Sequence, residues 1–195
     1  MMELHLVRHG RTFANEKWLY CGQTDVPLTE SGKAELITLK NQGIYPPPAD
    51  MFFTSGLCRA EQTVDAIYGS VLRTPIPDIA EYNFGVFEMK SHEELKEREN
   101  YQAWITDETG TVPCPGGESK VQFNKRILGG YSHILNSALH SGCNSVFVLS
   151  HGGTIACIME FLRPKIKNIY EWLPQSGRGY SLSYISGQLS VYKPI

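Results

Sequence analysis

Two histidines stand at positions where a side chain can attack or hold an anion. His9 follows the apolar run of residues 3–8, and His151 follows the apolar run of residues 145–150. Both runs predict buried strands. Glycine comes directly after each histidine, so the backbone can turn sharply there and approach a ligand closely. If the two strands are parallel neighbours, both imidazole rings face one crevice.

Two arginines are expected to join these rings. Arg8 adjoins His9, and Arg59 lies near the start of a predicted helix, residues 57–68, that follows a strand candidate at 50–54. Guanidinium groups match the oxygens of a phosphate in geometry and charge. Cationic neighbours also favour a neutral imidazole, which is the nucleophilic form. The pattern predicts phosphoryl transfer to histidine, with the arginines in place of a metal ion.

A departing alkoxide needs a proton, and a carboxylic acid can supply it. Glu81 follows the strand candidate at residues 74–79, so we assign it as the general acid and then as the base for the hydrolytic water. Glu88, Glu93 and Glu94 are nearby alternatives. No histidine pair has the H-E-x-x-H spacing of a metal site, so we expect no metal and no cofactor.

The composition limits the partners. The chain has 195 residues, 42% hydrophobic and 19% charged, with a formal net charge of −2 and no basic block. This balance argues against nucleic acid, whose backbone needs a concentrated positive face. The apolar runs are too short to cross a bilayer, and no signal peptide is evident. The five cysteines lack C-x-x-C pairing, which favours free thiols in a cytoplasmic protein. We expect a monomer or a homodimer.

Strands and helices alternate along the chain. Helices are predicted at residues 29–42, 57–68, 118–140 and 154–162, and strands at residues 3–8, 50–54, 74–79 and 145–150. Residues 180–185 and 189–192, around Ser186-Gly187, predict a closing hairpin. The order indicates an α/β fold: a three-layer α/β/α sandwich with a mostly parallel central sheet and a C-terminal antiparallel hairpin. We expect one domain, 1–195, in which residues 88–117 form a small helical flap.

Five stretches, in order, resemble the motifs of the histidine phosphatase superfamily, which has the phosphoglycerate-mutase-like fold. They are Arg8-His9-Gly10-Arg11-Thr12 with Asn15, Gly22 to Thr29 with Ser31-Gly32, Ser55 to Thr63, Glu81-x-x-Phe84-Gly85, and Ser150-His151-Gly152-Gly153-Thr154. The resemblance covers residues 3 to about 160. Residues 115–119 and Tyr101-x-x-Trp104 are similar to the phosphatase branch, including its alpha-ribazole-phosphatase-like and broad-specificity members. The chain departs from the common pattern at Phe87 and Met89-Lys90, where tryptophan and glycine are usual.

The resemblance implies a role for each matched residue. His9 becomes the phosphorylated nucleophile, Arg8, Arg59 and His151 form the phosphate pocket, and Glu81 is the proton donor. On the substrate side, the resemblance implies a lining of Asn15, Tyr20, Cys21 and Gly22. The expected activity is metal-independent hydrolysis of a small phosphorylated metabolite.

Two other functions fit the same residues. A phosphoglycerate-type mutase returns the phosphoryl group to another oxygen of the substrate instead of to water. A non-catalytic module binds the phosphorylated ligand without turning it over, although all five catalytic candidates are present here. Arg178, between two glycines, is either a loop cation or a further contact for a substrate anion.

Overall fold

The computed structural model describes residues 1–164, 166, 169–185 and 187–195. The elements along the described chain are β1 (Met2–Arg8), α1 (Phe13–Glu16), α2 (Glu30–Asn41), β2 (Met51–Thr54), α3 (Cys58–Tyr68), β3 (Thr74–Pro75), the 3₁₀ turns η1 (Pro77–Ile79) and η2 (Gly85–Phe87), α4 (His92–Leu95), α5 (Glu99–Ile105), α6 (Lys120–Ser141), β4 (Ser145–Ser150), α7 (Gly152–Leu162), η3 (Ile169–Trp172), β5 (Gly179–Ile185) and β6 (Gln188–Pro194).

The described strands form one mixed sheet in the order β3-β2-β4-β1-β5-β6. The first four are parallel to their neighbours, and β5 and β6 run antiparallel, which confirms the predicted mostly parallel sheet with a closing hairpin. The register of the two central strands pairs Arg8 with Ser150. The residues that follow them, His9 and His151, therefore leave the sheet side by side at its carboxyl edge. Ser186, in the predicted turn, lies outside the described residues.

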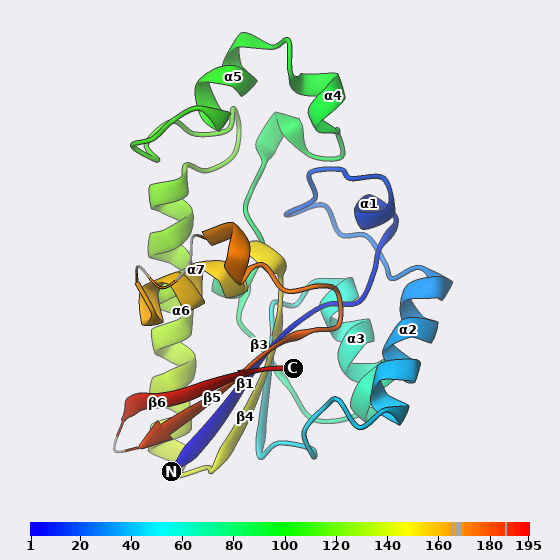
Figure 1. Ribbon diagram of the computed structural model, residues 1–195, viewed down its shortest axis with the longest axis vertical. Helices are drawn as coiled ribbons and strands as arrows, with labels where there is room; N and C mark the ends of the chain where they lie inside the picture. Colours follow the sequence, from blue (N-terminus) through cyan, green and yellow to red (C-terminus); the bar gives the residue numbers. More distant parts are fainter. Residues whose placement is uncertain (165, 167–168, 186) are drawn as a thin grey trace.

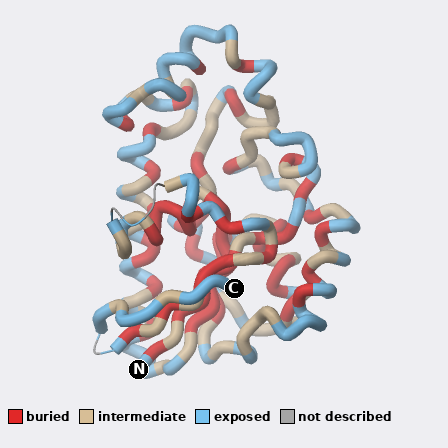
Figure 2. Tube along the Cα trace, in the orientation of Figure 1, coloured by how far each residue is buried: buried red, intermediate tan, exposed pale blue. Residues whose placement is uncertain are grey.

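Alternating side chains of the sheet fill two separate cores. Leu4 and Leu6 point to the face covered by α6 and α7, whereas Val7 points to the face covered by α3. Helix α2 packs outside α3 through Leu36. Strand residues alternate between faces with period two, so the central strands, apolar at nearly every position, are buried on both sides. Figure 1 shows the three layers, and Figure 2 shows the buried positions gathered along the sheet and its helices.

The predicted strand at residues 74–79 was too long. Only Thr74–Pro75 pair with β2, and the 3₁₀ turn η1 begins at Pro77. Pro75 and Pro77 have no N–H to donate to a sheet ladder, so the pairing cannot extend. The amide of Ile76 still donates to Thr54 O at 2.8 Å, and this is the last backbone hydrogen bond between this segment and the end of β2. The chain then turns away from this edge strand and carries Glu81 toward the start of α7.

Residues 88–117 hold two short helices, α4 and α5, above the sheet edge (Figure 1). A capping box between Ser91 and Glu94 begins α4. Tyr101 of α5 is fully buried, and its ring lies against Phe87 and Trp104. This segment matches the small helical flap expected from the sequence. No described helix has the length and apolar character required to cross a membrane.

Candidate active site

The two histidines meet as the register requires. The rings of His9 and His151 lie edge to face with centroids 5.1 Å apart, and only 5% and 0% of these residues is exposed. The backbone amide of His9 donates to Ser150 O at 3.0 Å, which extends the parallel ladder by one link. His151 is the N-cap of α7, so the helix N-terminus also points at this place. A helix N-terminus favours an anion there.

One ring nitrogen of His9 forms a hydrogen bond with the backbone. Its Nδ1 lies 2.7 Å from Gly10 O. A carbonyl oxygen only accepts, so Nδ1 carries the ring proton and Nε2 holds the free lone pair. Burial, followed by the charges of Arg59 and Arg8, lowers the pKa of His9 well below its ordinary value of 6.5. The ring is therefore neutral at pH 7, which is the state required of a nucleophile.

Arg8 and Arg59 bring two positive charges to the rings, Arg59 buried and Arg8 partly buried. Both guanidinium groups act electrostatically on both histidines. Arg59, 1% exposed, comes from the first turn of α3, and its Nη1 and Nη2 donate to Thr24 O at 3.0 Å and Gly22 O at 2.6 Å. Arg8 Nη1 donates to Pro174 O at 2.8 Å. The accepting carbonyls are neutral, so these hydrogen bonds hold both side chains in place without cancelling their charge.

Some polar atoms at the site have no protein partner. Among the described residues, Nε of Arg8 and Nδ1 of His151 are buried without a hydrogen bond. The other ring nitrogen of His151, Nε2, lies 2.8 Å from the Ser55 hydroxyl. Buried polar atoms are normally satisfied, so an unpaired set beside two cations marks a place that a ligand completes. A tetrahedral anion has the charge and the oxygens to do so.

Glu81 reaches the same place from the loop after η1. Its Oε2 accepts a hydrogen bond from the amide of Gly153 at 2.8 Å, and its Oε1 accepts one from the amide of Tyr82 at 2.9 Å. The carboxylate also acts electrostatically on Arg8. A Cβ on Gly153 would lie 2.4 Å from Glu81 Oε1, so a larger residue here would push the carboxylate aside. The acid candidate is thus held against the first turn of α7, next to the second histidine.

The alternative carboxylates lie elsewhere. Glu88 accepts hydrogen bonds from backbone amides of residues 22–24, and Glu94 caps α4. Glu93 pairs with Lys96 on the flap. Of the four glutamates considered as proton donors, Glu81 is the one bound at the histidine-bearing helix.

The predicted substrate-side residues occupy one loop and one short helix. Asn15 closes a capping box with Thr12 at the start of α1, a one-turn helix in a segment read from sequence as irregular. The Tyr20 hydroxyl lies 2.6 Å from that of Tyr101 in the flap, and Cys21 Sγ lies 3.6 Å from Thr24 O. Gly22 uses its N–H toward Glu88 and its carbonyl toward Arg59. Their contact with substrate stays a prediction.

Arg178 enters the site through its backbone. Its carbonyl accepts a hydrogen bond from the amide of Arg8 at 2.9 Å, just before the nucleophile candidate. Gly177 adds to this contact, since its amide donates to the carbonyls of Arg8 and His9. The loop before β5 therefore fixes the backbone of the nucleophile. A substrate contact by the Arg178 side chain stays a prediction.

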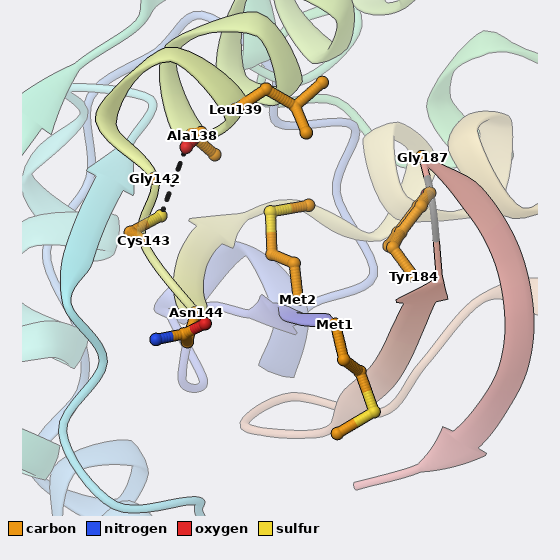
Figure 3. A pocket seen from close by; sticks show the side chains of 9 residues that line it. All are labelled: Met1, Met2, Ala138, Leu139, Gly142, Cys143, Asn144, Tyr184 and Gly187. Atoms are coloured by element: carbon orange, nitrogen blue, oxygen red, sulfur yellow. Dashed lines mark hydrogen bonds between the residues drawn. The ribbon is translucent and has the colours of Figure 1, made fainter.

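The site lies at one end of the sheet only. A second hollow, at the amino end of β1, is lined by Met1, Met2, Ala138, Leu139, Gly142, Cys143, Asn144, Tyr184 and Gly187 (Figure 3). None of these lining residues has a charged side chain, whereas the carboxyl edge brings together Arg8, Arg59 and two histidines. The cationic carboxyl edge is the candidate active site.

The fold and this site define a histidine phosphatase. The family model described as histidine phosphatase superfamily (branch 1) matches residues 4–190, so the chain belongs to that family. This confirms the resemblance seen in the motifs.

Several relatives of this chain are phosphatases by name. An adenosylcobalamin/alpha-ribazole phosphatase of Salmonella typhimurium is 33% identical over 162 residues, covering 81% of this chain and 78% of that protein. A probable phosphoglycerate mutase GpmB of Yersinia pestis is 31% identical over 169 residues, covering 83% and 75%. The crystal structure of a putative alpha-ribazole-5'-P phosphatase from Escherichia coli superposes with a TM-score of 0.83 at 26% identity, covering 97% and 93%. These relatives support a phosphatase activity for this chain.

Proposed function

We propose that this chain is a metal-independent phosphomonoesterase that hydrolyses a small phosphorylated metabolite through a phosphohistidine on His9. The observation that carries the proposal is the state of the His9 ring. Its Nδ1 proton is engaged by Gly10 O, which leaves Nε2 as a nucleophile beside the charges of Arg59 and Arg8. Residues 1–195 are proposed to act as a single domain.

The reaction has two steps. Nε2 of His9 forms a bond to phosphorus while the ester P–O bond breaks, and Glu81 gives its proton to the departing oxygen. Water then forms a new P–O bond while the N–P bond breaks, and Glu81 takes the proton of that water. Arg8, Arg59 and His151 hold the three non-bridging oxygens through both steps. Their fixed charges supply the neutralisation that phosphoryl transfer requires.

The substrate to test first is alpha-ribazole phosphate, because relatives at 33% identity carry that activity in their names. Sugar phosphates, phosphoserine and phosphoglycerates complete the panel of small monoesters. The mutase is the second candidate, favoured by the relatives named phosphoglycerate mutase at 31% identity. Incubation with 3-phosphoglycerate separates the two, since a phosphatase releases inorganic phosphate and a mutase releases 2-phosphoglycerate. A binding module would yield neither product.

The central experiment measures phosphate release from p-nitrophenyl phosphate by the wild type, with and without EDTA, and by His9→Ala. We expect turnover unaffected by EDTA and abolished in His9→Ala. Phosphorylated protein, trapped by alkaline quench and found by mass spectrometry kept at neutral or alkaline pH, should carry the modification on His9. His133→Ala changes an exposed histidine on α6 and should keep full activity. Strong inhibition by EDTA, or full activity of His9→Ala, would refute the proposal.

A further inference from the structure

The carboxylate of Glu88 gathers hydrogen-bond donors from a loop distant in sequence. The loop 22–24, consisting of Gly22, Gln23 and Thr24, turns its three backbone amides toward this one side chain. The donors to the Glu88 oxygens are the amide of Gly22 at 3.0 and 3.1 Å, the amide of Gln23 at 3.0 Å, the amide of Thr24 at 3.2 Å, the Thr24 hydroxyl at 2.7 Å and the amide of Phe84 at 3.2 Å. A carboxylate can only accept hydrogen bonds, so the two oxygens of Glu88 are well suited to bind this group of donors.

The other side of the same loop holds Arg59. The carbonyls of Gly22 and Thr24 accept the two hydrogen bonds from the Arg59 guanidinium, at 2.6 and 3.0 Å. The loop thus has an anion on its amide side and a cation on its carbonyl side. Charge-assisted hydrogen bonds at both ends fix the orientation of these peptides more strongly than neutral contacts would. The direction of the Arg59 side chain depends on the direction of those carbonyls.

The loop 22–24 packs closely against the segment that it binds. A Cβ on Gly22 would lie 1.6 Å from Tyr82 O and 2.9 Å from Glu88 Oε1, so the backbone sits between the two. The Gln23 side chain donates to Glu81 O at 2.9 Å. The loop therefore touches the segment with the acid candidate as well as Arg59.

We propose that Glu88 is a positioning residue that aims Arg59 at the phosphoryl group by holding the loop 22–24. This inference rests on the proposed function, because Arg59 is assigned there to the phosphate pocket. Glu88 itself does not touch the substrate, since its two oxygens are occupied by the loop. The proposal gives this glutamate a role other than proton donor and makes the start of the flap part of the phosphate site.

Binding of inorganic phosphate tests the proposal without turnover. In Glu88→Gln an amide NH₂ replaces one acceptor oxygen and faces backbone donors. The donors of the loop that bonded to this oxygen therefore lose their acceptor. We expect phosphate, titrated calorimetrically or by ³¹P NMR, to bind about tenfold more weakly, as the loss of a hydrogen bond to a charged group implies. With p-nitrophenyl phosphate, kcat should fall by a similar factor. Glu94→Gln removes a carboxylate that accepts a backbone amide elsewhere on the flap, and it should bind phosphate as the wild type does.

A double-mutant cycle separates positioning from general support of the fold. If Glu88 acts through Arg59, adding Glu88→Gln to Arg59→Ala should not weaken phosphate binding further. Additive losses, or wild-type binding by Glu88→Gln alone, would overturn the proposal. A wild type that binds phosphate but turns over no ester would refute the proposed function and leave this result standing.

A milder variant serves if Glu88→Gln does not fold, as judged by circular dichroism. Thr24→Val keeps the backbone of the loop and removes only the hydroxyl that donates to Glu88. We expect a smaller loss of phosphate affinity, about threefold, that also vanishes in the Arg59→Ala background. Unchanged affinity in Thr24→Val would then count against the proposal.

Discussion

Ser55 and His151, 96 residues apart in the chain, are joined by a hydrogen bond of 2.8 Å between the serine hydroxyl and Nε2 of the ring. Ser55 follows β2, and His151 follows β4, its neighbour in the sheet. The bond engages one ring nitrogen and leaves Nδ1 as the buried atom without a partner among the described residues. A serine that donates to Nε2 makes Nδ1 the N–H that faces an anion.

Ser55→Ala should therefore impair both stability and activity. The buried Nε2 loses its partner, which costs about 1–3 kcal/mol of unfolding free energy, and the tautomer of His151 is no longer fixed. We expect kcat for p-nitrophenyl phosphate to fall about tenfold or more. Urea unfolding and steady-state kinetics measure the two effects. Ser132→Ala, at an exposed position of α6, should change neither. Wild-type kcat in Ser55→Ala would show that His151 needs no orientation by Ser55.

Gly153→Ala should displace the proton donor. The new Cβ would lie 2.4 Å from Glu81 Oε1, so the carboxylate must leave its place on the Gly153 amide. Loss of acid catalysis lowers the rate by at least about a hundredfold for a poor leaving group. We expect a large fall in kcat for an alkyl phosphate and a much smaller fall for p-nitrophenyl phosphate, whose leaving group needs no proton.

Gly129→Ala is the matched control for that substitution. A Cβ on Gly129 meets nothing within 4 Å, and alanine favours the helix by about 1 kcal/mol. This variant should keep both activities and resist urea better than the wild type. Equal losses on the two substrates in Gly153→Ala would mean that Glu81 does not supply the proton.

Thr63→Val should weaken the support beneath the nucleophile. The buried Thr63 hydroxyl accepts from the amide of Gly10 at 2.9 Å and donates to Arg59 O at 2.7 Å. Valine has the same shape but leaves the buried Gly10 amide unpaired, which costs about 1–3 kcal/mol. Because Gly10 O holds His9, kcat should fall as well. In Thr38→Val the lost hydroxyl bonds within an exposed turn of α2, so stability should change by less than about 0.5 kcal/mol.

Stability should fall as pH falls, in a window set mainly by His9 and His151, the buried histidines of the candidate site. The pKa of His5, which is also buried, is lowered by burial as well. Burial comes first among the causes that lower the pKa of His9 and of His151 well below 6.5. Below pH 6.5 the unfolded chain takes up protons on both rings while the folded chain does not. The stabilisation is therefore complete above pH 6.5 and is lost as pH falls toward the folded-state pKa, by up to about 1.4 kcal/mol per pH unit for each ring.

Urea unfolding between pH 7 and pH 5 measures this slope. His9→Asn should reduce it by about 1.4 kcal/mol per pH unit, because one of the linked protons is gone. His133→Asn replaces an exposed ring and should leave the slope unchanged. If His9→Asn and the wild type lose stability equally, the ring of His9 is not held neutral by its surroundings.

The sheet and the cluster of histidines and arginines could be predicted because each depends on local signals. Apolar runs marked β1 and β4, and glycine after each strand marked the turn. Parallel pairing then brings strand ends together without further information. Pro75 and Pro77 indicated a short edge strand at residues 74–79, but not that its pairing with β2 would end after Pro75. The one-turn helix α1 has four residues and too little periodicity to be recognised.

The supporting contacts could not be predicted from sequence. Ser55, Thr63 and the amide of Gly153 act through directions that only the folded backbone sets. Glu88 entered the sequence analysis as an alternative acid because a carboxylate near a strand end fits that role. Its actual partners are backbone amides more than 60 residues away, as shown by the bonds to Gly22 and Gln23. No residue type in the loop 22–24 indicates that its backbone amides would bind the carboxylate of Glu88.

The closing hairpin decides where the two ends of this chain emerge. Gly179, the partner of Val7 in the sheet, exchanges backbone hydrogen bonds with Ile195, whereas Met2 begins β1 at the opposite edge, about 20 Å away along a seven-residue strand. A polypeptide fused after Ile195 would start near the carboxyl edge of the sheet, where the candidate active site lies. One fused before Met1 would start at the amino edge, so immobilisation through that end keeps the attachment away from the candidate site.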